Sequence, residues 1–141
     1  TLDFKADPQL NRYQDKPHAL HICVYQLTNP NSLYQYSSDQ SGLSQLLQCT
    51  KFDPSVTMVK RVVMQPDTES TLVLDRAQGT RYVGFVAGYS ELNKDNSVQL
   101  VKIPIVEETR GWIRRKTTRK LGLLEKTIEL GPLAIQKAGE Q

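Results

Sequence analysis

Alternating apolar and polar positions mark one long strand near the start of the chain. Residues 19–27 form a run without glycine or proline, as expected of a strand whose side chains point to opposite faces in turn. Both faces carry side chains that favour burial. They are Leu20, Ile22 and Val24 on one face and Cys23, Tyr25 and Leu27 on the other. A strand that is apolar on both faces belongs inside a sheet and not at its edge. We therefore expect the other elements to pack around this strand.

Shorter strands are predicted along the rest of the chain. Residues 2–6 alternate until Pro8, and later strands are expected at residues 56–65, 69–75, 80–89, 99–106 and in two short runs within 126–137. Seven or eight short strands separated by turn signals are typical of an all-β, two-sheet β-sandwich. We expect one such domain over residues 1–141. Its predicted core includes Leu20, Ile22, Val24, Val83 and Phe85.

A short helical insertion is predicted between the strands, at about residues 30–50. Ser32 could cap a first turn, and Asp39 or Ser41 could cap a second helix. The apolar positions of these helices would be Leu33 and Tyr36, then Leu43, Leu46 and Leu47. We expect the insertion to pack on one edge of the sheet. In the strand at residues 80–89, Gly84 and Gly88 lie on the face opposite Val83 and Phe85 and leave room for another layer or for bulges.

The net charge of +3 comes from one basic segment. Six basic residues crowd into residues 110–120, within a stretch, 107–120, that lacks a clean period and predicts an excursion or an irregular edge. They are Arg110, Arg114, Arg115, Lys116, Arg119 and Lys120. No recognition helix or stacking platform accompanies them, so we predict no nucleic-acid partner and favour a solvated basic loop or strand. Attraction to anionic lipid headgroups is a third interpretation, which we rank between nucleic-acid binding and a purely solvated segment. Residues 91–97 are expected to form a polar loop.

Catalytic and metal-binding patterns are missing from the sequence. His21 and Cys23 share a strand face, but a metal site needs three or four ligands and no further cluster completes this pair. We find neither a nucleophile elbow nor a glycine-rich phosphate loop. We therefore predict no enzyme, no metal and no cofactor. Cys23 and Cys49 lie 26 residues apart and could form one disulfide in an oxidising compartment, although Cys23 would also pack well as a free thiol.

Binding through loops is the remaining function that the pattern supports. Two loops carry aromatic residues, at residues 11–17 and 28–38. Tyrosine is enriched in interfaces because it contributes a large contact area and a hydrogen bond at low entropic cost. Each tyrosine could equally pack against its own sheet. The candidate contact residues are Asn11, Arg12, Tyr13, Gln14, Asp15, Lys16, Tyr34 and Tyr36.

The order of these features resembles the TssJ family of type VI secretion lipoproteins. The resemblance covers about residues 2–106, with a weaker echo in the last two strands. It is carried by Leu2-x-Phe4-x-Ala6, Leu10-Asn11, Val24-Tyr25-Gln26-Leu27, Leu46-Leu47, a strand running into Pro66, and Tyr82-Val83-Gly84-Phe85-Val86-Ala87-Gly88-Tyr89. The basic segment 107–125 is longer than the family pattern.

The resemblance implies a transthyretin-like sandwich held at the periplasmic face of the outer membrane. An acylated cysteine would precede Thr1, so the sequence given corresponds to the part that follows the signal peptide and the lipid-bearing cysteine. The family binds the periplasmic C-terminal part of TssM, and TssL completes the same envelope-spanning complex. The family loop used for TssM falls here on residues 11–17. In the oxidising periplasm, the Cys23–Cys49 disulfide is expected.

A second function class stays open at this point. A transthyretin-like carrier would hold a small ligand between its sheets, in an apolar pocket with convergent polar groups. A packed core with a prominent Tyr13 loop would instead favour the adaptor. An enzyme of the transthyretin-like hydrolase kind would want a histidine-rich site that two histidines do not supply.

Overall fold

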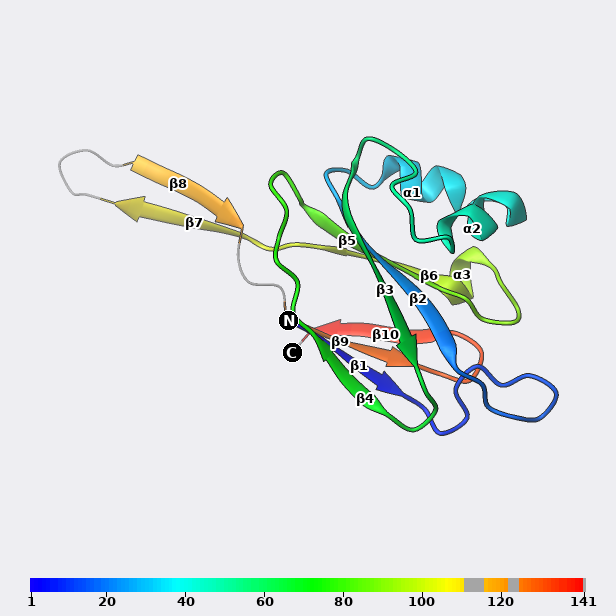
Figure 1. Ribbon diagram of the computed structural model, residues 1–141. Coiled ribbons are helices and arrows are strands. Elements are labelled where there is room, and N and C mark those ends of the chain that lie inside the picture. Colours follow the sequence, from blue (N-terminus) through cyan, green and yellow to red (C-terminus); the bar gives the residue numbers. More distant parts are fainter. Residues whose placement is uncertain (111–115, 122–124, 141) are drawn as a thin grey trace.

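The computed structural model describes the backbone of residues 1–110, 116–121 and 125–140, and it shows a β-sandwich (Figure 1). One sheet has the strand order β10-β9-β1-β4 and the other β3-β2-β5-β6. The first consists of β1 (Leu2–Ala6), β4 (Glu69–Leu72), β9 (Lys126–Leu130) and β10 (Ile135–Glu140). The second consists of β2 (Leu20–Leu27), β3 (Val56–Met64), β5 (Tyr82–Ala87) and β6 (Val98–Lys102). The predicted two-sheet sandwich is confirmed.

Strand β2 lies inside its sheet, as its two apolar faces predicted. It pairs antiparallel with β3 on one side and with β5 on the other. The face that carries Ile22 and Val24 points to the core between the sheets, and the face that carries Cys23 and Tyr25 points to the outer layer. Each face is buried because a different layer covers it.

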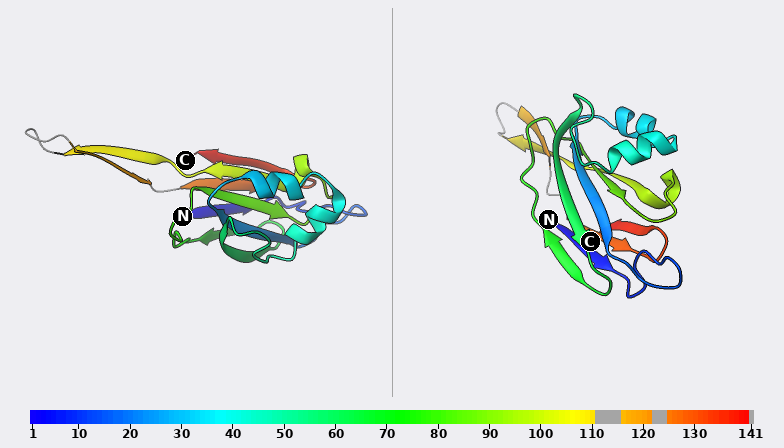
Figure 2. Two further views of the ribbon diagram at one scale, coloured as in Figure 1. Left: turned by 90° about the horizontal axis from the view of Figure 1, so that it is seen from above. Right: turned by 45° about the vertical axis from the view of Figure 1, so that its right-hand side comes forward.

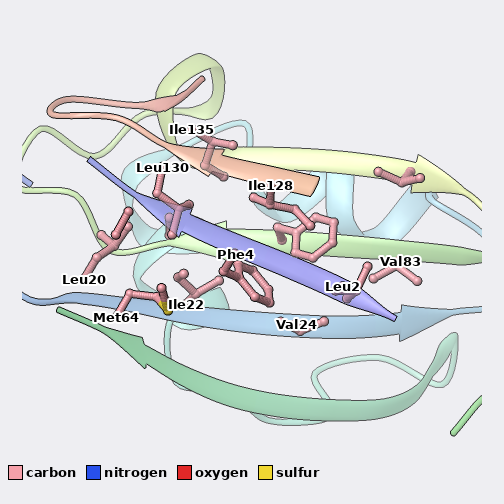
Figure 3. Packing of buried hydrophobic residues seen from close by; sticks show 14 of the residues in the cluster. Leu2, Phe4, Leu20, Ile22, Val24, Met64, Val83, Ile128, Leu130 and Ile135 are labelled. Carbon is pink, nitrogen blue, oxygen red and sulfur yellow. The ribbon is translucent and has the colours of Figure 1, made fainter. Parts of the chain in front are cut away.

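The core between the sheets is filled by side chains from both (Figure 3). The rings of Phe4 and Phe85 meet edge to face, with 6.0 Å between their centroids and 78° between their planes. The five predicted core residues are all buried, as are Leu2, Ile128, Leu130 and Ile135. Strand β1 runs parallel to β9 and antiparallel to β4, so both ends of the chain build one sheet.

Two helices, α1 (Asn31–Tyr36) and α2 (Gln40–Leu46), cover the outer face of the second sheet (Figure 1). Asp39 caps α2 by accepting a hydrogen bond from the Gly42 backbone N–H at 2.7 Å, which confirms one of the two predicted caps. The predicted Ser32 cap is wrong. Pro30 occupies that position, and the buried Ser32 hydroxyl bonds to Ser55 Oγ at 2.7 Å.

This helical layer closes over Tyr25. Its hydroxyl donates to the backbone carbonyl of Leu46, and its ring meets Phe52 edge to face with 5.2 Å between centroids. Burial raises the pKa of Tyr25 to about 12, so it stays a neutral donor. Leu33 of α1 packs over Gly84, where an added Cβ would lie 2.7 Å from Leu33 Cδ2. Helix α1 is therefore the additional layer for which the glycines of this strand were predicted to leave room.

We expect Gly42→Ala to destabilise the protein although alanine is the better helix former. An added Cβ at Gly42 would overlap the backbone carbonyl of Tyr36, and neither backbone segment can move away cheaply. Overpacking of this kind costs about 1–3 kcal/mol. Urea denaturation measures the loss. Ser41→Ala, at an exposed position of the same helix, is the matched control and should stay within about 0.5 kcal/mol of wild type.

Three segments differ from the sequence predictions in whole or in part. The strand predicted at residues 99–106 breaks at Ile103 and Pro104 into β6 and β7 (Ile105–Arg110). The basic segment, predicted to be an excursion or an irregular edge, is an excursion that forms an antiparallel pair of β7 with β8 (Lys116–Leu121). Within the described residues these two strands pair with each other and join neither large sheet. Residues 111–115 and 122–124 of that segment lie outside the described residues.

A third helix replaces part of the loop predicted at residues 91–97. Helix α3 (Lys94–Ser97) is a single turn, and Asn93 caps it by accepting from the Asn96 backbone N–H at 2.8 Å. Among the described residues, no helix is long and apolar enough to cross a membrane.

Candidate interaction surface at the loop between β1 and β2

The loop between β1 and β2 ends in a tight, hydrogen-bonded tip. Tyr13 and Lys16 exchange two backbone hydrogen bonds of 2.9 and 3.1 Å. The two residues between them, Gln14 and Asp15, have φ values of 51° and 62°. Positive φ at both central positions is the geometry that lets a two-residue turn continue the twist of its flanking strands. The tip is therefore defined by its backbone, although neither central residue is glycine.

The base of the loop is fixed to the sandwich by Asn11. Its Nδ2 donates to the Ala19 carbonyl at 3.1 Å, and its Oδ1 accepts from the Ser90 backbone N–H at 3.1 Å. Asn11 is only 9% exposed, and its side chain supports the loop from inside. A second connection comes from the Arg12 backbone N–H, which donates to the Pro132 carbonyl at 2.8 Å.

Two large apolar side chains are exposed at this end of the molecule. Tyr13 is 52% exposed, with its ring centroid 6.0 Å from that of His18. Leu133, in the turn between β9 and β10, is also 52% exposed. The Arg12–Pro132 hydrogen bond brings this turn against the loop. We call Tyr13 and Leu133 the end patch.

Leu133 was missed in the sequence. The turn Gly131-Pro132 was predicted, but only the pairing of β9 with β1 shows that this turn lies next to the loop at residues 11–17.

Charged and polar residues border the end patch. Arg12 Nη2 and Asp15 Oδ1 form an exposed ion pair at 3.2 Å, and Gln14 and Lys16 are exposed beside them. An exposed ion pair of this kind contributes about 0–1 kcal/mol to stability. These side chains are therefore available to a partner at little cost to the fold.

The second predicted loop divides into one exposed and one supporting tyrosine. Tyr34 on α1 is 45% exposed, and Lys94 Nζ lies 5.2 Å from its ring centroid. Tyr36 instead packs on Phe52, with 4.8 Å between ring centroids, and belongs to the cluster under the helices. The structure thus keeps Tyr34 as a candidate contact and makes Tyr36 part of the packing.

A carrier function finds no support in the described residues. The space between the sheets is filled by packed side chains such as that of Phe4 (Figure 3). Phe4 and Phe85, whose rings meet there, are both fully buried. Three depressions lined by described residues lie at the surface, along β1 and β4, beside Tyr34, and between the α1–α2 connection and Asn93. A ligand carried between the sheets would have to displace the core.

Cys23 and Cys49 form a disulfide, with their Cα atoms 5.2 Å apart. The bond ties the central strand β2 to the segment after α2. His21 Nε2 lies 3.9 Å from Cys23 Sγ and 3.7 Å from Cys49 Sγ, so the three residues gather at one point. Both sulfur atoms are consumed by the disulfide and have no thiolate to offer a metal ion. The cluster is therefore a cross-link with a histidine beside it.

Comparison with solved structures shows where this fold recurs. TssJ1, the type VI secretion lipoprotein of Pseudomonas aeruginosa, superposes with a TM-score of 0.70 at 21% identity, over 95% of this chain and 89% of that one. Lip of Serratia marcescens, a membrane-bound component of the type VI secretion system, gives 0.68 at 17% identity, over 96% and 93%. A chain in the structure described as the TssM C-terminal domain (869–1107) from EAEC gives 0.69 at 15% identity, over 96% and 93%.

A comparison with curated proteins found no match. The sequence itself matches, over residues 1–125, the family described as type VI secretion lipoprotein, VasD, EvfM, TssJ. Members of that family are structural lipoproteins of the secretion system and not enzymes. The match covers most of the chain and coincides with the β-sandwich that the solved lipoproteins share, and the chain therefore belongs to the type VI secretion lipoprotein (TssJ) family.

Proposed function

We propose that the chain is a lipid-anchored adaptor at the periplasmic face of the outer membrane, and that its end patch binds the periplasmic C-terminal domain of TssM. The family match supports the lipoprotein part. The Cys23–Cys49 disulfide agrees with an oxidising compartment such as the periplasm. Two of the similar structures are described as a TssM domain and as a type VI membrane complex, in which TssL would be an indirect neighbour.

The position of the loop relative to the N-terminus is the observation that carries this proposal. Thr1 and the loop at residues 11–17 lie at opposite ends of the sandwich (Figure 2). A lipid attached before Thr1 would hold the N-terminal end at the membrane surface. The end patch would then point away from that membrane, into the periplasm where a TssM domain is reached.

The chemistry of the end patch suits a protein partner. A half-exposed tyrosine and a half-exposed leucine on two turns joined by a backbone hydrogen bond are the kind of aromatic and aliphatic residues found at the centre of an interface. The hydrogen bonds of Asn11 and of the Tyr13–Lys16 tip hold the loop before binding, which lowers the entropic cost of association. Arg12, Asp15 and Lys16 would form a charged rim that affects association rate and salt dependence more than affinity.

Tyr13→Ala and Leu133→Ala are each expected to weaken binding of the TssM periplasmic domain by about 1–3 kcal/mol. Each removes contact area that the partner would cover. The melting temperature should change little, because both side chains are exposed in the free protein. Isothermal titration of the purified domain gives the affinities.

Tyr34→Ala is the matched control, since it removes an exposed tyrosine of similar exposure from the other candidate loop. It should leave the affinity within about twofold of wild type, as expected outside a hot spot. Loss of affinity in Tyr34→Ala with wild-type binding by Tyr13→Ala and Leu133→Ala would move the partner site to α1 and α3.

A further inference from the structure

Three side chains with metal-binding atoms meet where β2 faces the segment after α2. His21 Nε2 lies 3.7 Å from Cys49 Sγ and 3.9 Å from Cys23 Sγ. Only His21 and Cys23 are neighbours in the sequence, and the fold brings Cys49 to them from 26 residues away. Imidazole and thiolate are the ligands that zinc prefers in proteins. The cluster therefore holds the ligand types of a zinc site, although the disulfide occupies both sulfur atoms.

The position of His21 already fits a metal-bound arrangement. In a tetrahedral zinc site the Zn–S bonds are about 2.3 Å and the Zn–N bonds about 2.0–2.1 Å, which places the ligand atoms roughly 3.5–3.8 Å apart. Both nitrogen–sulfur distances in the cluster are close to this range. Only the two sulfur atoms are too close, because they are bonded to each other. Reduction of the disulfide therefore supplies the one change that the geometry requires.

Contacts other than the disulfide hold Cys49 near the sheet. The Tyr25 hydroxyl donates to the backbone carbonyl of Leu46, at the end of α2. Arg61 Nη2 of β3 donates to the backbone carbonyl of Gln48 at 3.2 Å. Both bonds attach the residues just before Cys49, and neither depends on the sulfur atoms. We expect them to keep the three ligands together after reduction, so that the cost of assembling the site is low.

Charge and exposure at the cluster also suit a metal ion. Arg61 lies directly opposite Cys23 in the pairing of β2 with β3, so the two side chains point to the same face of the sheet. A nearby guanidinium favours the thiolate, which is the form of cysteine that binds metal. Cys23 is fully buried, whereas His21 and Cys49 are partly exposed and leave a path from solvent.

We propose that the reduced chain binds one zinc ion through His21 Nε2 and the thiolates of Cys23 and Cys49, with the fourth position left to water. The metal then replaces the disulfide as the cross-link between β2 and the segment after α2. Oxidation reverses the exchange. A small external disulfide takes two electrons from the two thiolates and becomes two thiolates itself, the Cys23–Cys49 bond forms, and Zn²⁺ is released.

Zinc titration of the reduced and the oxidised chain tests the site. The protein is reduced with a phosphine, freed of reductant without air, and titrated with Zn²⁺ against a chromophoric chelator. Reduced wild type should bind one equivalent and oxidised wild type none. His21→Ala in the reduced chain should lower the affinity about tenfold or more, because loss of an outer-shell partner alone costs about 10–100-fold. His21→Gln, which keeps a polar side chain of similar size, should lower it likewise.

His18→Ala is the matched control. It removes the other histidine of the chain, which belongs to the loop that follows β1 and is not part of the cluster. The affinity should stay within about twofold of wild type, because every proposed ligand is still present. Circular dichroism of the oxidised variants, which keep the disulfide, verifies that each is folded.

Two further readouts report on the ligands themselves. Co²⁺ in place of Zn²⁺ should give the thiolate charge-transfer and tetrahedral ligand-field bands in reduced wild type, and Cys49→Ser should lose the charge-transfer intensity of one thiolate. Oxidised glutathione added to the zinc-loaded chain should release one Zn²⁺ for each disulfide formed.

Three results would overturn the site. They are absence of zinc binding by the reduced wild type, equal affinities of His21→Ala and wild type, and zinc binding by the oxidised chain as tight as by the reduced one. The second would leave an adventitious contact of two thiolates only. None of these measurements involves TssM, so the outcome is independent of the proposed contact at the end patch.

Discussion

Phe85→Ala is expected to lower the free energy of unfolding by about 3–5 kcal/mol. Phe85 is fully buried in β5, pairs with Val24 of β2 across the sheet, and meets the Phe4 ring from the opposite sheet. Truncation removes its transfer free energy and leaves a cavity between two sheets that are each fixed by their own hydrogen bonds. Urea denaturation followed by circular dichroism measures the change.

Val63→Ala provides the comparison for Phe85→Ala. Val63 is an apolar strand residue of β3 but is 57% exposed, so its truncation should change stability by about 0.5 kcal/mol or less. Equal effects of the two variants would mean that the inter-sheet core does not hold the sheets together as described.

Removal of the disulfide is expected to cost about 3 kcal/mol. The bond closes a stretch of 26 residues that includes α1 and α2, and it fixes the end of this stretch to the fully buried Cys23 of β2. Without it the unfolded chain gains conformational freedom, and the helical layer over Tyr25 loses one of its attachments. The double variant Cys23→Ala and Cys49→Ala should therefore unfold at lower urea concentration than the oxidised wild type.

Stably reduced wild type is the control for this variant. Reduction breaks the S–S bond but keeps both cysteine side chains, whereas the alanine substitutions also remove the sulfur atoms. It should unfold near the midpoint of the double variant. If oxidised and reduced wild type unfold together, the cross-link contributes nothing to stability and the expected loss is refuted.

The sequence predicted those elements whose patterns reflect burial. Strand β2 was recognisable because two different layers cover its two faces, and β1 because Leu2, Phe4 and Ala6 alternate toward the core. The cap of α2 by Asp39 is a local signal that a few neighbouring residues carry. The pairing of β7 with β8 was not predicted because the basic segment lacks a clean period, and α3 was not predicted because a single turn is too short to show one.

The exposure of the candidate contact residues follows their polarity only in part. Tyr13 is exposed at the tip, as its polar neighbours indicated. Asn11 and Leu133 exchange the roles that their polarity suggested, since the amide is buried and the leucine exposed. Both outcomes depend on contacts between segments far apart in the chain, with Ser90 for Asn11 and with the loop itself for the turn at Pro132. The periodicity of apolar and polar residues does not predict contacts between distant segments.

Photo-crosslinking from position 13 tests the central proposal most directly. A photoreactive phenylalanine analogue replaces Tyr13 in one protein and Tyr34 in another, both at exposed positions where the fold should tolerate it. Each protein is irradiated with the periplasmic domain of TssM, and covalent adducts are identified by mass spectrometry. The proposed interface predicts an adduct from position 13 and none from position 34; an adduct from position 34 with none from position 13 would contradict it.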